Sequence, residues 1–315
     1  METSNLQAIA QHHRWKREAG IALLLASLVL ALFLFIPLAP EHAPAQQAAV
    51  AAAATPDAYA GLPISAKAAV VYDLSTKTIL YSRNEGAQLP LASLTKLLTV
   101  YAALHALGSD AVVTIPADAT KLDPPHSFSA GEQFKLADLA RVTLTGSLND
   151  GATALAEAAA AQLHESPAAL LEATAQALGL SATYALNGSG LDESGTVSGG
   201  YGSARDIAIL AGALESEAPA IAQATTEASA SAPSLAGVVH TAKNTNPGTA
   251  EAPRLLLSKT GYTDLAGGNL AVVFDAGIGH PIAVVVLGSS ESDRFTDATA
   301  LVNATIAHFS GVQSL

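Results

Sequence analysis

A serine and a lysine three residues apart, Ser93 and Lys96, are the residues of this sequence best suited to nucleophilic chemistry. On a helix this spacing places the hydroxyl and the amine on one face, one turn apart. Serine becomes a good nucleophile when a base removes its proton, and lysine can be that base when burial or a nearby cation lowers its pKa. The backbone N–H of Ser93, at a helix start, is also suited to stabilising an oxyanion. The pair predicts acyl transfer, although a serine that only caps a surface helix gives the same pattern.

Two further short motifs follow in the chain. Ser147-Leu148-Asn149 lies between two predicted helices, and Lys259-Thr260-Gly261 follows the apolar run LLLS at 255–258. Ser-x-x-Lys, Ser-Asp-Asn and Lys-Thr-Gly are the signature set of penicillin-binding proteins and class A β-lactamases, and three similar motifs follow in that order here. The set of three is much more specific than any one of its members.

The residues around these motifs strengthen the match. The segments that carry it are LPLASLTKLLTVYAAL, AGEQFKLADLARVTLTGSLNDGATALAEAA, YGSARDIAIL, Asn244-Thr245-Asn246 and KTGYTDLAGGNLAVV. With them, over about residues 62–310, the chain resembles the serine D-alanyl-D-alanine carboxypeptidases, the low-molecular-mass penicillin-binding proteins of the S11 peptidase type. The resemblance implies a β-lactamase/transpeptidase-like fold.

The same resemblance implies three catalytic residues. Ser93 would attack the penultimate D-alanine of a peptidoglycan stem peptide and form an acyl-enzyme. Lys96 would be its base, and Ser147 would relay a proton to the departing D-alanine. β-Lactam antibiotics would be covalent inhibitors, and no cofactor or metal is implied.

Substrate-binding roles are implied for six more positions, which are Asn149, Lys259, Thr260, Gly261, Tyr262 and Arg294. Asn149 would hydrogen-bond the substrate amide and orient the lysine. Lys259 and Thr260 would bind the terminal carboxylate, with Arg294 as a further contact. The Tyr262 N–H would complete the oxyanion hole.

Other functions on the same scaffold remain open. A class A β-lactamase holds its hydrolytic water with a Glu-x-x-Leu-Asn segment, and none occurs between residues 150 and 200. A DD-endopeptidase would use the same motifs, and a non-catalytic peptidoglycan-binding protein would be expected to have lost some of them. Because that segment is absent and all three motifs are present, we expect a carboxypeptidase. One departure from the family is Gly151, where alanine is usual.

The elements that must position these residues follow from the hydrophobic pattern. Residues 67–74 and 78–83 predict a β-hairpin, and 269–275 and 281–287 predict two more strands joined by a turn at 276–279. Helical spacing is present at 93–106, 135–145, 150–163, 166–178, 203–214 and 293–309. Strands at both ends of the chain and helices between them predict an α+β fold, with a mainly antiparallel sheet built from both ends and a helical lobe.

The N-terminal part predicts export to the outside of the cytoplasm. Residues 19–40 carry no charge over 22 positions, about 33 Å as a helix, which is enough to cross a bilayer. Arg14, Lys16 and Arg17 precede this run and place the N-terminus in the cytoplasm. The chain is therefore expected to cross the cell membrane once.

The predicted organisation has four parts. They are a cytoplasmic tail at 1–18, a transmembrane anchor at 19–40, an Ala-rich tether at 41–61 and a catalytic domain at 62–315. The alternative is a signal peptide cleaved near Ala43-Pro44-Ala45, which would release a secreted domain.

Composition excludes several function classes. The chain has no cysteine, so disulfides, thiolate metal sites and a cysteine nucleophile are ruled out. Its nine histidines show no paired metal spacing, so no metal is expected. Beyond residue 40 there are 25 acidic residues against 12 Lys and Arg. A nucleic-acid partner is therefore excluded, because phosphate binding needs clustered positive charge.

Overall fold

The central element is an antiparallel sheet assembled from both ends of the segment that begins at residue 57. The computed structural model describes residues 14–16, 20–21, 23–28, 57–250, 254–277 and 279–311. Within them the sheet has the strand order β10-β11-β12-β1-β2. Its strands are β1 (Ala68–Asp73), β2 (Thr78–Arg83), β10 (Leu255–Thr263), β11 (Gly267–Asp275) and β12 (Pro281–Ser289). β1 pairs directly with β12, with Ala68 opposite Leu287. The prediction of a sheet built from both ends is confirmed.

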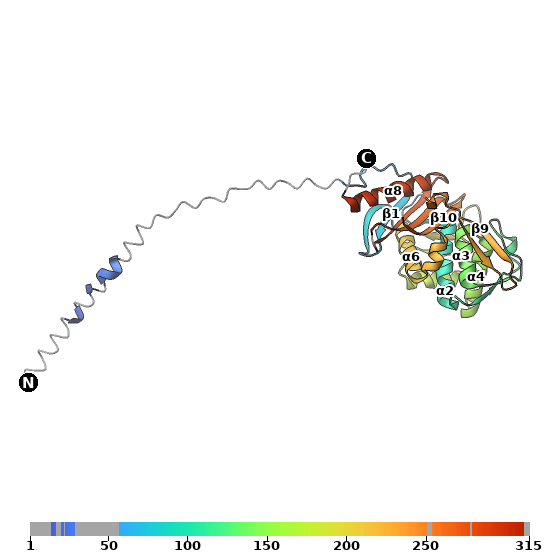
Figure 1. The fold of residues 1–315 in the computed structure, drawn as a ribbon, viewed down its shortest axis with the longest axis horizontal. Coiled ribbons are helices and arrows are strands. Elements are labelled where there is room, and N and C mark those ends of the chain that lie inside the picture. Colours follow the sequence, from blue (N-terminus) through green and yellow to red (C-terminus); the bar gives the residue numbers. More distant parts are fainter. Residues whose placement is uncertain are drawn as a thin grey trace, which may run out of the picture. The chain divides into compact units, whose positions relative to one another are not determined.

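Both faces of this sheet are covered, which explains why its central strands are apolar runs rather than alternating ones. Along β1, Val70 and Tyr72 pack into the core of the helical lobe. Ala69 and Val71 point to the other face, where they share a core with α8 (Asp293–Ser310). Figure 1 shows α8 over one side of the sheet and α6 (Ala204–Glu217) on the other.

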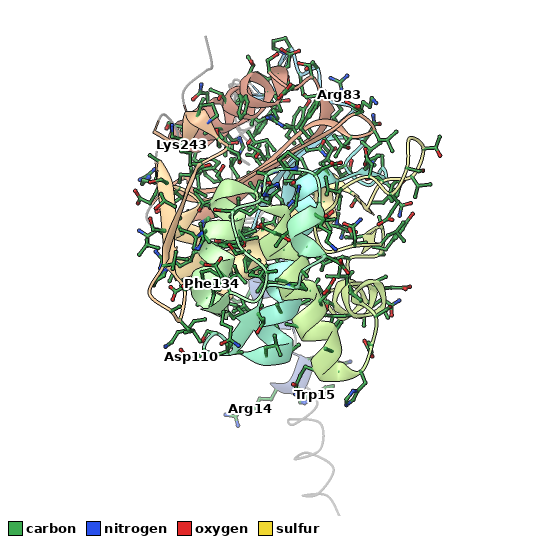
Figure 2. The ribbon with its side chains drawn as sticks, turned by 90° about the vertical axis from the view of Figure 1, so that its right-hand side faces the viewer. Arg14, Trp15, Arg83, Asp110, Phe134 and Lys243 are labelled. Carbon is green, nitrogen blue, oxygen red and sulfur yellow. The ribbon has the colours of Figure 1, made fainter. Side chains whose placement is uncertain are left out.

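The helical lobe follows the predicted periodicity except for one short helix at 219–224, which was not predicted. In addition to α6 it contains α2 (Thr95–Leu107), α3 (Leu136–Gly146), α4 (Asn149–Leu163), α5 (Pro167–Ala177) and α7 (Pro219–Ala224). Two helix starts have serine caps: Ser166 Oγ accepts a hydrogen bond from the Ala169 N–H at 3.2 Å, and Ser203 Oγ accepts one from the Asp206 N–H at 3.1 Å. Figure 2 shows Phe134, a buried residue of this core, in the helical lobe.

Several short elements that the hydrophobic pattern did not predict complete the described fold. They are β3 (Leu89–Pro90), β4 (Val112–Thr114), β5 (Gln133–Lys135), β6 (Tyr184–Ala185), β7 (Gly200–Gly202), β8 (Ser229–Pro233), β9 (Val239–Lys243) and the 3-10 turns η1 (Ala92–Leu94), η2 (Ala119–Lys121) and η3 (Pro247–Ala250). β3, β7 and β6 form a small sheet, β4 pairs with β5, and β8 pairs with β9. β10 also continues past the apolar run at 255–258, so that the Lys-Thr-Gly motif lies inside the strand.

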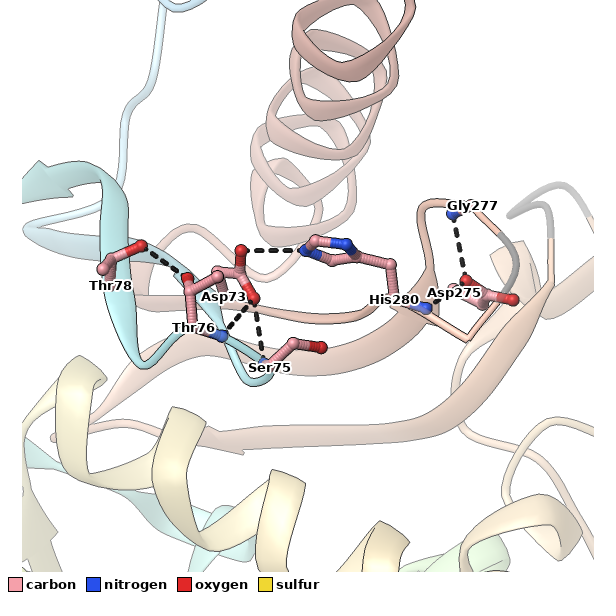
Figure 3. A network of polar contacts seen from close by, with 7 residues as sticks. All are labelled: Asp73, Ser75, Thr76, Thr78, Asp275, Gly277 and His280. Carbon is pink, nitrogen blue, oxygen red and sulfur yellow. Dashed lines mark hydrogen bonds and ion pairs between the residues drawn. The ribbon is translucent and has the colours of Figure 1, made fainter.

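One end of the sheet is held by a polar network around Asp73 (Figure 3). One oxygen of this buried carboxylate accepts hydrogen bonds from the N–H groups of Ser75 and Thr76, at 2.9 and 3.0 Å. The other oxygen lies 2.8 Å from Nε2 of His280, which precedes β12. The network therefore joins the β1–β2 turn to the β11–β12 turn.

The N-terminal predictions lie largely outside the described residues. Of the predicted cytoplasmic tail, residues 14–16 are described; of the anchor at 19–40, residues 20–21 and 23–28; and of the tether at 41–61, residues 57–61. Over the described residues, no helix has the length and apolar character needed to cross a membrane. Pro56–Leu315 form one compact unit. Within it Tyr59, in the range predicted as tether, is buried, and its hydroxyl donates to Thr305 Oγ1 at 3.1 Å.

Candidate active site

Ser93 lies in the 3-10 turn η1, immediately before α2, rather than in the first turn of the α-helix as predicted. The turn is fixed from the sheet side by Asn269 of β11, whose Nδ2 donates to the carbonyl oxygens of Pro90 and Leu91, each at 3.0 Å. Ala92, beside the serine, has a φ of 49°, a left-handed conformation that costs free energy in alanine and recurs at functional sites. Asn269 therefore acts on the position of Ser93 through the backbone that precedes it.

Lys96 is fully buried and reaches oxygen atoms from separate parts of the fold. Its Nζ lies 2.7 Å from Ser93 Oγ, 2.8 Å from Asn149 Oδ1 and 2.7 Å from the carbonyl oxygen of Ser189. The amide oxygen and the backbone carbonyl oxygen can only accept hydrogen bonds, whereas the hydroxyl of Ser93 can also donate one. This set of partners suits a neutral amine.

The electrostatic surroundings favour that neutral form. Burial, and then the positive charge of Lys259, hold the pKa of Lys96 well below its usual range, while the carboxylate of Asp150 acts in the opposite direction. A neutral amine has two N–H groups, which donate to the two carbonyl oxygens, and one lone pair. That lone pair then faces the hydroxyl of Ser93, where it can take the proton.

Asn149, the first residue of α4, is held by the loop at 123–128. Its Nδ2 donates to the carbonyl oxygen of Asp123 at 2.8 Å, and its backbone N–H donates to the carbonyl oxygen of Pro125 at 2.7 Å. Because a carbonyl oxygen can only accept, the first contact determines which way the amide is turned. The amide oxygen of Asn149 must therefore face Lys96.

Ser147 and Lys259 form the opposite wall of the site. Ser147 ends α3 in a left-handed conformation, with a φ of 57°, and its Oγ accepts a hydrogen bond from Lys259 Nζ at 2.9 Å. Lys259 Nζ also donates to the carbonyl oxygen of Thr260 at 2.7 Å. Burial, and then the charge of Arg294, lower the pKa of Lys259 to about 7. At neutral pH this amine can therefore carry a charge or lose it.

Arg294 reaches the same strand from α8. Its Nη1 donates to the carbonyl oxygen of Gly261 at 2.7 Å, while its Nε is buried without a hydrogen-bond partner in the described structure. Glycine is required at position 261, because an added Cβ would lie 2.8 Å from the carbonyl oxygen of Leu91. This close approach brings β10 against the turn that carries Ser93.

The outer edge of β10 carries no further strand in the described sheet, since β10 ends the strand order. In a strand, the backbone groups of alternate residues point to the same edge. The Ser258 N–H donates away from the sheet to Thr225 Oγ1 at 2.9 Å, and the Thr260 carbonyl accepts from Lys259. The Tyr262 N–H, two residues further on, therefore faces the outer edge, as an oxyanion donor must. The Tyr262 side chain is exposed.

The structure thus brings together the predicted residues of all three motifs, with Arg294 against the same strand. Three contributors were not predicted: the carbonyl oxygen of Ser189, the carboxylate of Asp150, and Thr245, whose Oγ1 lies 2.5 Å from Thr260 Oγ1. The Asn-Gly-Ser-Gly sequence at 187–190 was an available turn signal for the first. Within the described part of the chain, no group of three or more His, Asp and Glu side chains could hold a metal ion.

Comparisons with known proteins agree with this geometry. The family model for D-alanyl-D-alanine carboxypeptidases, peptidase S11, matches residues 50–291. The D-alanyl-D-alanine carboxypeptidase DacD of Salmonella typhimurium is 30% identical over 266 residues, covering 80% of this chain and 65% of DacD. The chain thus spans less than two thirds of that relative.

Two solved structures are similar over most of their length. The D-alanyl-D-alanine carboxypeptidase of Mycobacterium tuberculosis has a TM-score of 0.69 and 27% identity, over 79% of this chain and 95% of that one. Penicillin-binding protein D2 of Listeria monocytogenes in its cefotaxime-bound form has a TM-score of 0.64 and 27% identity, over 78% and 98%. On the evidence of the family match, the chain belongs to the D-alanyl-D-alanine carboxypeptidase family, peptidase S11.

Proposed function

We propose that this protein is a serine D-alanyl-D-alanine carboxypeptidase that removes the terminal D-alanine from peptidoglycan stem peptides. The observation that carries the proposal is the hydrogen bonding of Lys96. Two carbonyl acceptors and the Ser93 hydroxyl surround its buried Nζ, so that the neutral amine presents its lone pair to the nucleophile. Family membership supports the same reaction.

In the acylation step, Ser93 Oγ attacks the carbonyl carbon of the penultimate D-alanine and Lys96 takes its proton. The negative oxygen that forms is stabilised by the N–H groups of Ser93 and Tyr262. The C–N bond to the terminal D-alanine then breaks, and Ser147 Oγ relays to the leaving nitrogen the proton that Lys96 took from Ser93, so that Lys96 is neutral again. Water hydrolyses the resulting ester, which restores the Ser93 hydroxyl and releases the shortened peptide.

The opposite wall binds the end of the substrate. Lys259, in its charged form, and the hydroxyl of Thr260 hold the terminal carboxylate, with the Arg294 guanidinium adding positive potential beside Gly261. Asn149 contributes twice, because it orients Lys96 and would also hydrogen-bond the substrate amide. Gly261 lets the peptide lie against the edge of β10 as an added strand.

β-Lactam antibiotics should acylate the same serine. Structures of the Listeria relative contain bound cefotaxime and ampicillin. A β-lactam that acylates Ser93 would remain attached as an ester, provided that water attacks it slowly. A label that stays on the protein would also separate a carboxypeptidase from a β-lactamase.

We further propose that the catalytic unit acts on the outer face of the cell membrane, held there by a single N-terminal span. The support is the uncharged run at 19–40 with Arg14, Lys16 and Arg17 before it. The N-terminus would then be cytoplasmic, and cleavage near Ala45 would release the domain instead. Fractionation of cells expressing the full chain tests this, because an anchored protein stays in the membrane pellet after a carbonate wash.

Two assays on the same protein test the activity. Wild type should release D-alanine from a pentapeptide ending in D-Ala-D-Ala and should be labelled by fluorescent penicillin, whereas Ser93→Ala should do neither. Preferential cleavage of a cross-linked dimer would indicate an endopeptidase, and many turnovers of penicillin per minute would indicate a β-lactamase. Wild type that shows none of these reactions would be a non-catalytic peptidoglycan-binding protein.

A further inference from the structure

A fully buried carboxylate, Asp150, stands next to Asn149 in the first turn of α4. Its Oδ2 accepts hydrogen bonds from two consecutive backbone N–H groups, those of Ser127 and Phe128, at 2.7 and 2.8 Å. Its Oδ1 accepts one from the Gly151 N–H at 2.8 Å. Asp150 therefore binds the loop at 123–128 to the start of α4.

The loop that Asp150 holds is the one that orients Asn149. The carbonyl oxygens of Asp123 and Pro125 accept from the side chain and the backbone of Asn149, at 2.8 and 2.7 Å. If the loop moved, the amide would lose the acceptor that turns its oxygen toward Lys96. A chain of contacts thus runs from Asp150 through the loop and Asn149 to the amine.

Asp150 also acts on Lys96 by its charge. The charged groups that act on the amine are Lys259 from β10, which lowers its pKa, and Asp150 from α4, which raises it. Asp123 and His126, which lie on the loop itself, are exposed. The hydrogen-bond partners of the amine, Ser93, Asn149 and the Ser189 carbonyl, are uncharged.

We propose that Asp150 is a positioning residue for the acylation step, because it holds the loop at 123–128 so that the amide oxygen of Asn149 stays directed at Lys96. Its negative charge also favours the protonated form of this amine. The inference rests on the proposed function, because it concerns the base in that reaction. Asp150 itself has no contact with the substrate in this scheme.

Asp73 provides a matched control for a purely structural carboxylate. It is also buried, and one of its oxygens likewise accepts from two consecutive N–H groups, those of Ser75 and Thr76 (Figure 3). It lies on β1, three strands from β10 in the sheet, which is about 14 Å at the usual strand spacing. Replacing Asp73 should lower the stability of the fold but leave Lys96 and Lys259 unaffected.

The test compares Asp150→Asn with Asp73→Asn in the full-length protein. Asparagine keeps the shape but offers one oxygen, so either the loop or the Gly151 N–H loses its acceptor. We expect Asp150→Asn to slow acylation by fluorescent penicillin by about tenfold or more, a typical effect of misplaced catalytic groups. Its acidic limb in the pH–rate profile should also move to lower pH, because an opposing negative charge has been removed from Lys96. Asp73→Asn should be acylated at a rate within about twofold of that of wild type at every pH.

A double-mutant cycle, measured at a pH above the acidic limb, shows whether Asp150 acts through Asn149. In an Asn149→Ala background, adding Asp150→Asn should change the acylation rate by less than about twofold, because the orientation it maintains is already lost. If Asp150→Asn does not fold, Ser127→Pro removes one of the N–H donors and keeps the carboxylate. That variant should slow acylation and leave the acidic limb in place.

The outcomes separate this inference from the proposed function. If wild type is labelled and Asp150→Asn behaves like Asp73→Asn in rate and in pH profile, the positioning role is wrong and the proposed function stands. Equal slowing by Asp150→Asn with and without Asn149 would also overturn it. A wild type that takes no label would refute both.

Discussion

Because two lysines are buried with lowered pKa values, we expect the free energy of unfolding to rise with pH. In the folded protein the pKa of Lys96 is held well below its usual range and that of Lys259 is lowered to about 7, from an ordinary value of 10.5. Between these values the unfolded chain binds protons that the folded protein has released. Raising the pH therefore favours the folded state, and the gain is complete once the pH passes the unfolded value.

The size of the effect follows for Lys259. Each unit of pKa difference corresponds to about 1.4 kcal/mol, so from about pH 7.5 to 9.5 this residue alone adds about 2.5 kcal/mol to the free energy of unfolding. Lys259→Met removes that contribution at similar side-chain volume. It leaves Ser147 Oγ and the Thr260 carbonyl without their donor, a cost that does not depend on pH. The difference in stability between variant and wild type should therefore shift by about 2.5 kcal/mol in favour of wild type across this range.

Urea unfolding at the two ends of this pH range, followed by circular dichroism, measures the shift. Lys243→Met, a substitution of an exposed lysine (Figure 2), is the matched control and should keep the wild-type slope. If Lys259→Met retains that slope as well, or if wild type shows none, then Lys259 is not a buried amine with a lowered pKa, and the reasoning is wrong.

Two further predictions follow from the same region. The kcat/KM for D-alanine release should fall about tenfold between about pH 6 and pH 8 as Lys259 loses its proton. Arg294→Met should move this fall to higher pH, because the guanidinium is one cause of the lowered pKa of Lys259. A fall at the same pH in the variant would contradict this. Gly151→Ala should lower the free energy of unfolding by about 1–3 kcal/mol, because the new Cβ would lie 2.1 Å from Thr143 Oγ1. Adding Thr143→Ala should recover most of that loss in urea unfolding, and no recovery would show that the clash lies elsewhere.

The sequence was sufficient to predict the central sheet and most helices, because their segments are long and their apolar residues recur with a clear period. β1 and β12 are apolar runs bounded by polar turns, and their pairing follows from closing the sheet. The β8–β9 hairpin had no comparable signal. The inward positions of β8 are Ala230 and Ala232 between exposed residues, too little hydrophobic contrast for a strand pattern.

The site was predictable where its side chains belong to the three short motifs, but not at Asp150 and Thr245, whose roles depend on contacts made in the folded chain. Ser93, Lys96, Ser147 and Lys259 belong to short motifs with fixed spacing. One acceptor of Lys96, Asn149 Oδ1, belongs to a predicted motif. The other, the Ser189 carbonyl, belongs to the backbone, as do the carbonyls of the 123–128 loop that hold Asn149. Every residue has a carbonyl group, so its use in a site leaves no mark in the sequence and becomes visible only when the chain is folded.

The two lysines are arranged so that substrate binding can activate the base. Lys259, with a pKa of about 7, would gain positive charge when a carboxylate binds beside it, since an opposite charge favours the protonated amine. That charge lowers the proton affinity of Lys96, because Lys259 is one of the causes that hold its pKa down. The negative charge of the carboxylate opposes this only in part when it lies further from Lys96 than Lys259 does. A peptide amide that lacks the terminal carboxylate should then react more slowly even at saturation, because it leaves the base less well prepared and not only the complex less stable. Single-turnover acylation rates at saturating concentrations of the two peptides measure this, and equal rates would mean that the carboxylate contributes to binding alone.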